Sequence, residues 1–337
     1  MDMGGVLNHY EYGTMGYNLF WLIESFCMVS VNAFVLITGY YGIKSNFRLS
    51  RVLRFYLEVL AFSVLVTFVA NLYSDESVGI AEWVYAIFPL TSKRYWFASN
   101  YALLIFIQPL LNVLIRNIDE QTHKICIVVL LVLFSVLPSF LLWNREVTGT
   151  GMDVIWFSIL YIVGAYIHNY GLLFIKVKWS ICYLLLSTEL FVTELVIPGL
   201  SKALIGRTAG IGVFNYYNNV FVFCASVAFF MIFIANKNSD KQEDDKLLKK
   251  LASIGGYVFG AYLISDHRAI RSLLWERIDI MGISDNPMIV LFYVLLVNVS
   301  VFIAGVILDC LIKNIITSKM INNVMNKIDF RVNRLLQ

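Results

Sequence analysis

Long apolar runs separated by short polar segments dominate the pattern of this 337-residue chain. A run of about 20 apolar residues can cross the hydrocarbon core of a bilayer as a helix, and the pattern predicts nine such helices. They are expected near 19–43, 52–72, 100–117, 124–142, 154–170, 179–197, 214–235, 251–265 and 287–311. The predicted fold class is therefore all-α, a polytopic bundle of transmembrane helices.

The composition supports a membrane protein. Hydrophobic residues make up 59% of the chain and charged residues 15%, whereas a soluble domain is about half apolar and about a quarter charged. The five cysteines are odd in number, lie in apolar runs and show no paired spacing. This arrangement predicts neither a disulfide framework nor a metal site. Membrane lipids are the expected surroundings, and we predict no nucleic-acid partner.

The distribution of positive charge predicts the orientation. Eighteen of the 26 lysines and arginines fall on one side of the predicted helices, and such residues concentrate in cytoplasmic loops. We therefore expect the chain to lie in the plasma or inner membrane, with its N-terminus outside and its C-terminus in the cytoplasm. A transmembrane domain at 1–312 would be followed by a basic amphipathic tail at 313–337, which would lie along the inner membrane surface.

Three arginines follow the first apolar helix. Arg48, Arg51 and Arg54 recur every three residues, so a helix would place them on one flank, at the predicted cytoplasmic side. Glu58 follows on the same flank, one turn further along. The rigid fork of arginine matches phosphate oxygens, such as those of coenzyme A. The alternative is that the arginines only anchor the helix at the inner surface.

The same segment resembles a known family. The stretch F-V-L-I-T-G-Y at 34–40, a short turn, the R-x-x-R of Arg51 and Arg54, and a second apolar helix resemble the second and third helices of the membrane acyltransferase-3 family. Further matching segments are Y-W-F at 95–97, P-L-L-N at 109–112 and Y-L-I at 262–264. Together these segments span most of the chain.

The resemblance implies a membrane-bound acyltransferase. It would move an acyl group, expected to be acetyl, from cytoplasmic acyl-coenzyme A to a hydroxyl of a cell-surface polysaccharide or its lipid-linked precursor. Acyl-coenzyme A would be a co-substrate, and no cofactor would be bound. Arg48, Arg51 and Arg54 would bind the donor, while Asn32 and Trp96 would lie on the acceptor side.

Members of this family generally have ten helices, with a histidine in the first helix that is taken to be catalytic. Here nothing apolar precedes Tyr17. We therefore expect the chain to lack that helix and its histidine, as an N-terminally incomplete or inactive acyltransferase.

Three other residues are candidates for catalysis. Glu24 lies on the first predicted helix about 80° from Asn32, and Glu189 lies near the centre of the sixth, with Glu194 closer to its end. A carboxylate within a membrane can act as a base, although interhelical hydrogen bonding is the alternative. His267 comes two positions later than the histidine that relatives commonly carry after Y-L-I. We expect it to be either an exposed loop residue or a ligand of the acceptor.

Two local patterns predict packing. The aromatic-rich stretch between the second and third helices is expected to rest at the membrane interface or to contact sugar rings. Its aromatic residues are Trp83, Tyr85, Phe88, Tyr95, Trp96 and Phe97. Gly256 and Gly260 form a GxxxG in the eighth helix, which predicts close helix packing.

Two other functional classes remain as alternatives. A flippase or transporter for lipid-linked sugars would be expected to have pseudo-symmetric halves with broken helices, and no internal repeat is visible. A polysaccharide polymerase would be expected to carry a large exterior loop, whereas the longest one predicted here has about 28 residues by the helix limits used.

Overall fold

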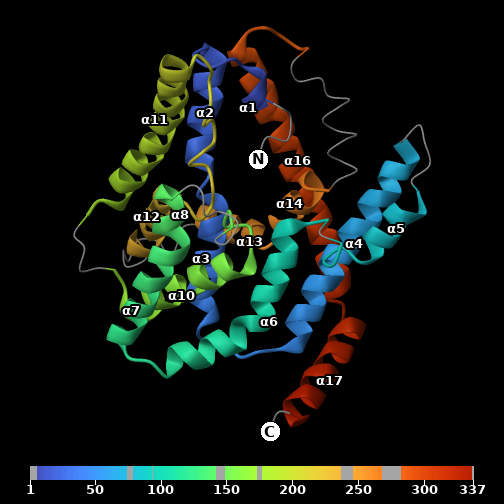
Figure 1. Ribbon diagram of the computed structural model, residues 1–337. Coiled ribbons are helices and arrows are strands. Elements are labelled where there is room, and N and C mark those ends of the chain that lie inside the picture. Colours follow the sequence, from blue (N-terminus) through green and yellow to red (C-terminus); the bar gives the residue numbers. More distant parts are fainter. Residues whose placement is uncertain are drawn as a thin grey trace. The chain divides into compact units, whose positions relative to one another are not determined.

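The computed structural model describes residues 6–73, 79–92, 94–141, 149–172, 177–236, 246–267 and 282–335. These residues form helices and no strands, which confirms the predicted all-α class (Figure 1). The helices are α1 (Val6–His9), α2 (Met15–Cys27), α3 (Ser30–Gly42), α4 (Leu49–Tyr73), α5 (Ile80–Ile87), α6 (Trp96–Arg116), α7 (Glu120–Leu131), η1 (Val132–Val136), α8 (Leu137–Phe140), α10 (Val154–Tyr170), α11 (Trp179–Ile205), α12 (Val220–Asn236), α13 (Lys246–Gly255), α14 (Phe259–Ser265), α16 (Pro287–Ile316) and α17 (Lys319–Leu335).

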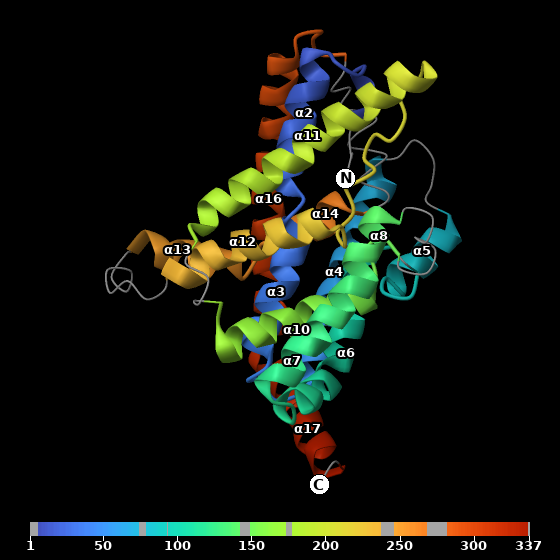
Figure 2. The ribbon, with the colours of Figure 1, turned by 60° about the vertical axis from the view of Figure 1, so that its left-hand side comes forward.

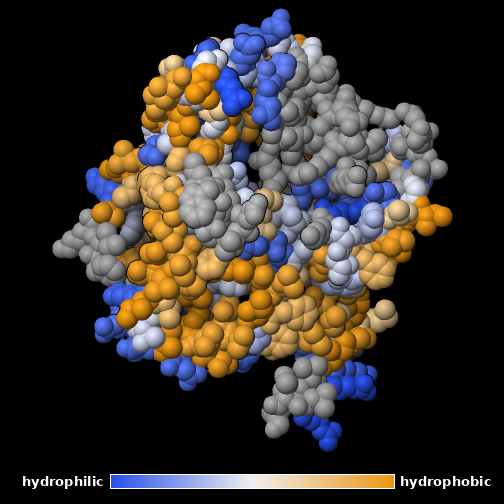
Figure 3. Space-filling model, in the orientation of Figure 1, coloured by the Kyte–Doolittle hydropathy of each residue, from blue (hydrophilic) through white to orange (hydrophobic). Residues whose placement is uncertain are grey.

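Six helical spans within the described residues are long and apolar enough to cross a membrane. They are Met15–Gly42, Leu49–Tyr73, Trp96–Arg116, Glu120–Phe140, Trp179–Ile205 and Pro287–Ile316. Large apolar side chains on these spans are exposed, including Leu110 at 63% and Phe292 at 69%. The face in Figure 3 shows a broad hydrophobic surface over α6 and α7. Apolar surface of this extent marks contact with lipid, so the chain is a membrane protein.

The described residues group into two compact units. Unit 1 consists of Met1–Val6, Phe47–Phe106 and Lys241–Gln337, and unit 2 of Leu7–Asn46 and Ile107–Asp240. Unit 1 contains α4, α5, α13, α14, α16 and α17, and unit 2 contains α2, α3, α7, α8, α10, α11 and α12.

Unit 2 is built on close packing between α3 and α10, and between α11 and α12 (Figure 2). Gly39 of α3 lies against the backbone of Tyr161 in α10, and Gly164 of α10 lies against the carbonyl of Leu36. A Cβ at either glycine would collide with main-chain atoms. Glycines allow this approach of two helix backbones, which explains the glycine in the stretch at 34–40.

In unit 1, α4 packs against α5, α14, α16 and α17. Its core includes Val59 and Phe62 of α4, with Leu263 of α14 and Ile312 of α16. The closest approach joins α14 to α16 at Gly260 and Gly305, where each glycine faces backbone atoms of the other helix. The predicted packing role of the GxxxG therefore holds for Gly260. It is wrong for Gly256: among the described residues, an added Cβ there would have one neighbour within 4 Å, the Ser253 carbonyl at 3.5 Å.

The first predicted helix is interrupted. Its residues form α2 and α3, which are separated by Met28 and Val29. The Ser25 hydroxyl donates to the carbonyl of Trp21 at 2.8 Å, and such a bond to the preceding turn bends a helix. Together the two helices form one apolar span, Met15–Gly42, which corresponds to the first predicted helix.

The eighth predicted helix, 251–265, is also interrupted. α13 ends at Gly255 and α14 begins at Phe259. Two consecutive glycines, Gly255 and Gly256, lie at the break, and glycine has a low helix propensity. The longest observed span, α16, continues to Ile316 and therefore extends beyond the predicted end at residue 311.

The aromatic stretch before α6 divides between surface and core. Tyr85 and Phe88 are exposed by 45% and 55%, as expected for an interface, but Tyr95 and Phe97 are buried at 0% and 6%. The prediction of an interface location is therefore wrong for Tyr95 and Phe97. Phe97 belongs to a ring cluster with Tyr262 of α14, with ring centroids 5.5 Å apart.

Candidate functional site

The three arginines singled out by the sequence lie at the start of α4 in unit 1. Arg48 immediately precedes the helix, and Arg51 and Arg54 follow within its first two turns. Arg48 and Arg51 are exposed, whereas Arg54 is half-buried. The first turn of a helix carries unpaired backbone N–H groups and the positive end of the helix dipole. This end of α4 therefore combines guanidinium groups with a positive potential that suits an anion.

Arg54 carries a buried polar atom without a partner. Its Nε is inaccessible to solvent and has no hydrogen-bond acceptor among the described residues. Buried side-chain polar atoms nearly always have a partner. The oxygens of an anion are the acceptors that a guanidinium binds most strongly, so this N–H group of Arg54 is a donor that an anion can use.

Glu58, one turn after Arg54 on α4, pairs with a different helix. Its Oε1 lies 3.2 Å from Nζ of Lys313 on α16. The same ammonium lies 2.9 Å from Oδ2 of Asp309 and donates to the carbonyl of Gly256 at 2.7 Å. Glu58 and Asp309 are 8% and 0% exposed, so one cation lies between two buried carboxylates.

The tail helix α17 also reaches the start of α4. Ser50, between Arg48 and Arg51, donates its backbone N–H to Oδ1 of Asp329 at 2.9 Å and its hydroxyl to Oδ2 at 2.6 Å. The carboxylate thus satisfies one of the free N–H groups of the first helical turn, as a capping side chain does.

His267 is fully buried in unit 1, so the expectation of an exposed loop histidine is wrong. Its Nε2 lies 2.9 Å from Nη1 of Arg94, which also donates to Oγ1 of Thr67 at 2.7 Å. The other terminal nitrogen of Arg94 donates to the Glu82 carboxylate and to the Glu82 carbonyl at 3.1 Å. Together these bonds connect α4, α5 and the residues that follow α14.

The partner of His267 sets its chemical form. A guanidinium only donates hydrogen bonds, so Nε2 is the acceptor and Nδ1 carries the ring proton. Burial, and next the charge of Arg94, lower the pKa of His267 to about 3. The imidazole is therefore neutral at physiological pH, and its acceptor atom is already used. In this arrangement His267 holds Arg94 in place and is a poor general base.

The candidate carboxylates of unit 2 differ in burial. Glu24 on α2 and Glu189 on α11 are half-buried, and Oε2 of Glu189 is a buried atom with no partner among the described residues. Glu194, five residues further along α11, is only 1% exposed. Its Oε2 accepts the backbone N–H of Gly212 at 2.7 Å. The sequence favoured Glu189, but Glu194 is the more deeply buried of the two.

The two residues expected on the acceptor side lie in different surroundings. Asn32 is fully buried in unit 2, where its amide nitrogen donates to the carbonyl of Tyr217 at 2.8 Å and its oxygen accepts from Nε1 of Trp156 at 3.0 Å. Both ends of the amide are therefore used in holding α3 to its neighbours. Trp96 begins α6 in unit 1, is half-buried and contacts the ring of Phe97 edge-to-face, with centroids 5.8 Å apart.

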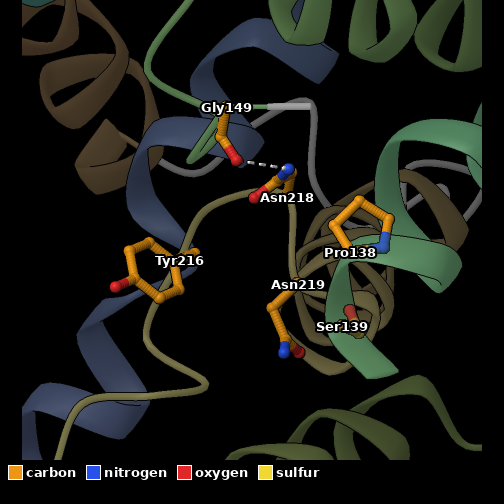
Figure 4. Close-up of a pocket in the computed structure, with 6 residues that line it drawn as sticks. All are labelled: Pro138, Ser139, Gly149, Tyr216, Asn218 and Asn219. Atoms are coloured by element: carbon orange, nitrogen blue, oxygen red, sulfur yellow. Dashed lines mark hydrogen bonds between the residues drawn. The ribbon is translucent and has the colours of Figure 1, made fainter. Parts of the chain in front are cut away.

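A small cavity in unit 2 lies beside α8 (Figure 4). Its lining residues are Pro138, Ser139, Gly149, Tyr216, Asn218 and Asn219. Its volume of about 10 Å³ has room for about one water molecule. The Asn218 amide donates across it to the carbonyl of Gly149 at 3.3 Å. The cavity is too small for an acyl donor or a sugar.

Comparison with known proteins decides the family. The acyltransferase-3 family model, described as an acyltransferase domain, matches residues 3–308. The chain belongs to the acyltransferase-3 family. The resemblance inferred from the segments at 34–54, 95–112 and 262–264 is thereby confirmed. No curated protein and no solved structure matched the chain in our searches.

Family membership makes this chain a membrane acyltransferase in general terms. Sequence reasoning missed Asp309 and Lys313 in the acyltransferase, although an acidic residue inside an apolar run is a recognised signal of function. Arg94 was only one of the eight lysines and arginines outside the group of eighteen assigned to the cytoplasmic side. Neither His267, 173 positions away in the chain, nor Glu82 could be recognised as its partner from local pattern.

Proposed function

We propose that this acyltransferase moves an acyl group, expected to be acetyl, from cytoplasmic acyl-coenzyme A to a hydroxyl of a cell-surface polysaccharide or its lipid-linked precursor. The hydroxyl oxygen forms a bond to the thioester carbonyl carbon, the carbon–sulfur bond breaks, and the hydroxyl proton ends on the thiol of coenzyme A. The protein lies in the plasma or inner membrane with its C-terminus in the cytoplasm. This orientation rests on the excess of positive charge on one side.

The donor binds through Arg48, Arg51 and Arg54. Coenzyme A carries a pyrophosphate and a ribose phosphate, which an arginine fork can bind through two parallel hydrogen bonds. The observation that carries this proposal is the buried, unpartnered Nε of Arg54 at the positive end of α4. The exposed guanidinium of Arg48 and the first turn of α4 support it, since helix N-termini attract phosphate groups.

The test replaces both Arg51 and Arg54 by lysine. Lysine keeps the positive charge and hence membrane insertion, but it lacks the bidentate fork. We expect acetyl esters on the purified surface polysaccharide to disappear, while the amount of protein in the membrane stays the same. Arg207→Lys, at an exposed arginine of unit 2, is the matched control and should leave the esters in place.

The same assay separates the alternatives. A flippase or a polymerase would change the amount or length of the polysaccharide without changing its ester content per sugar. Undiminished esters in the Arg51→Lys, Arg54→Lys variant would remove the arginines from the mechanism. A binding assay with coenzyme A and its 3′-dephospho form would then show whether any phosphate group is recognised.

A further inference from the structure

Arg54 and Glu58 are one turn apart on α4, a spacing at which opposite charges usually interact. In this structure they do not form an ion pair. Glu58 is instead bound to Lys313, and Nε of Arg54 has no acceptor among the described residues. Because Glu58 is only 8% exposed, its carboxylate requires a positive partner. Lys313 of α16 is the cation that pairs with Glu58, and Arg54 precedes Glu58 by four residues on the same helix.

Lys313 is held in place by groups from three segments. Its ammonium donates two hydrogen bonds, to Asp309 and to Gly256, and forms an ion pair with Oε1 of Glu58, which accepts no hydrogen bond among the described residues. The three oxygens belong to Glu58 of α4, Asp309 of α16 and the carbonyl of Gly256 between α13 and α14, at 3.2, 2.9 and 2.7 Å. The ammonium also lies 5.7 Å from the ring centroid of Tyr257, a distance at which a cation is attracted to an aromatic face. These contacts fix the ammonium beside Glu58 without any contribution from Arg54.

We propose that Lys313 is a positioning residue for donor binding, which it supports by occupying Glu58 and so leaving Arg54 available to a phosphate of the acyl donor. This inference rests on the proposed function. Without Lys313, the spacing of four residues on α4 lets Arg54 pair with the buried Glu58 carboxylate. Arg54 then turns to Glu58, and the donor loses a guanidinium.

A purely structural role of Lys313 is the competing explanation, because its bonds connect α4, α16 and the break before α14. The two explanations differ in what removal of Glu58 does. If Lys313 only holds the helices together, the affinity for coenzyme A follows the thermal stability in all four variants. If Lys313 keeps Glu58 from Arg54, removing Glu58 restores donor binding.

The test is carried out in an Asp309→Asn background, so that loss of the lysine does not leave the fully buried Asp309 without a cation. Four purified full-length variants are compared: Asp309→Asn alone, Asp309→Asn with Lys313→Met, Asp309→Asn with Glu58→Gln, and all three substitutions together. The affinity for coenzyme A is measured by calorimetry in detergent, with thermal unfolding recorded for each variant. The KM for the acyl donor is determined alongside kcat.

We expect Lys313→Met to weaken coenzyme A binding by about tenfold when Glu58 is present, the loss expected for one charged hydrogen bond. When Glu58 is replaced by Gln, the same substitution should change the affinity less than about twofold, within the usual error of additivity. The effect should appear in KM and not in kcat. Thermal stability should fall in both lysine variants, whether or not affinity is restored.

Two results would overturn the inference. One is an unchanged affinity after Lys313→Met in the presence of Glu58, and the other is a loss that persists after Glu58→Gln. Failure of the proposed donor site can be recognised separately. In that case the unmodified protein and an Arg54→Lys variant would bind coenzyme A with equal affinity, or neither would bind it.

Discussion

Asp329 accepts two hydrogen bonds from Ser50, the residue that lies between Arg48 and Arg51 at the start of α4. It is the only acidic residue of the otherwise basic helix α17. The single carboxylate of the tail therefore lies among the positive groups that we assign to the donor. The contact joins α17 to α4 within unit 1.

Replacing Asp329 by Ala should loosen α17. Loss of a capping carboxylate typically lowers the free energy of unfolding by about 1 kcal/mol. Hydrogen–deuterium exchange over residues 319–335 should become faster, and thermal unfolding should begin at a lower temperature. Asn326→Ala, at an exposed position of the same helix, should leave both measurements unchanged. Equal exchange in the two variants would show that the contact with Ser50 does not hold the helix.

Below neutral pH, protonation of His267 in the unfolded chain should lower the free energy of unfolding as the pH falls. The unfolded chain binds a proton at an ordinary histidine below about pH 6.5, whereas the folded protein binds one at His267 only near pH 3. Between these values the unfolded state binds more protons, so stability falls as the pH falls. His267→Gln retains an acceptor for Arg94 but does not titrate, and it should lose this part of the pH dependence.

The measurement compares thermal unfolding of the two proteins at about pH 7.5 and about pH 5, on either side of the ordinary histidine pKa. Between the higher and the lower pH, the unfolding temperature of the wild type should fall by more than that of His267→Gln. A His267→Leu variant should be less stable at both pH values, because it removes one of the acceptors of the buried Arg94 guanidinium. A pH dependence identical in wild type and His267→Gln would contradict the assigned neutral imidazole.

An alanine substitution should destabilise the protein at Gly305, in the contact between α14 and α16, but not at Gly256, outside it. A Cβ at Gly305 would meet the backbone of Ala261, and overpacking of this kind costs about 1–3 kcal/mol. Gly305→Ala should therefore lower the unfolding temperature and the yield of folded protein. Gly256→Ala should have little effect, since the space around Gly256 is open apart from one carbonyl. Similar losses for both substitutions would argue against the close approach of these helices.

Substitutions of Asn32 and Trp156 should have non-additive effects on the free energy of unfolding. Asn32→Leu removes the acceptor of Nε1 of Trp156 and a donor to the carbonyl of Tyr217, and loss of a partner costs a buried polar group about 1–3 kcal/mol. Trp156→Phe removes the partner on the other side. Because the two residues share a hydrogen bond of 3.0 Å, the double variant should lose less stability than the sum of the single variants. Additive losses would indicate that the bond contributes nothing.

The long helices could be predicted from the sequence because length and apolar content are local properties. The spans near 52–72, 100–117 and 287–311 correspond to α4, α6 and α16. The predictions failed where a local feature interrupts an apolar run, as at Met28 and Gly255. A hydropathy pattern does not register these breaks, because the residues around them remain apolar or small.

The candidate site was accessible to sequence reasoning only in part. The spacing of Arg48, Arg51 and Arg54 is visible in the chain, and the structure places all three at one helix end. The partners of Glu58 and His267 lie far away in sequence, so no periodicity could reveal them. Their burial follows from tertiary packing, and this explains why His267 was expected at the surface.

The break between α13 and α14 brings a peptide oxygen, that of Gly256, to the ammonium of Lys313. Such an oxygen is present whichever amino acid occupies the position. Mutation can therefore alter two of the three oxygens that surround this cation, while the third changes only if the course of the main chain changes.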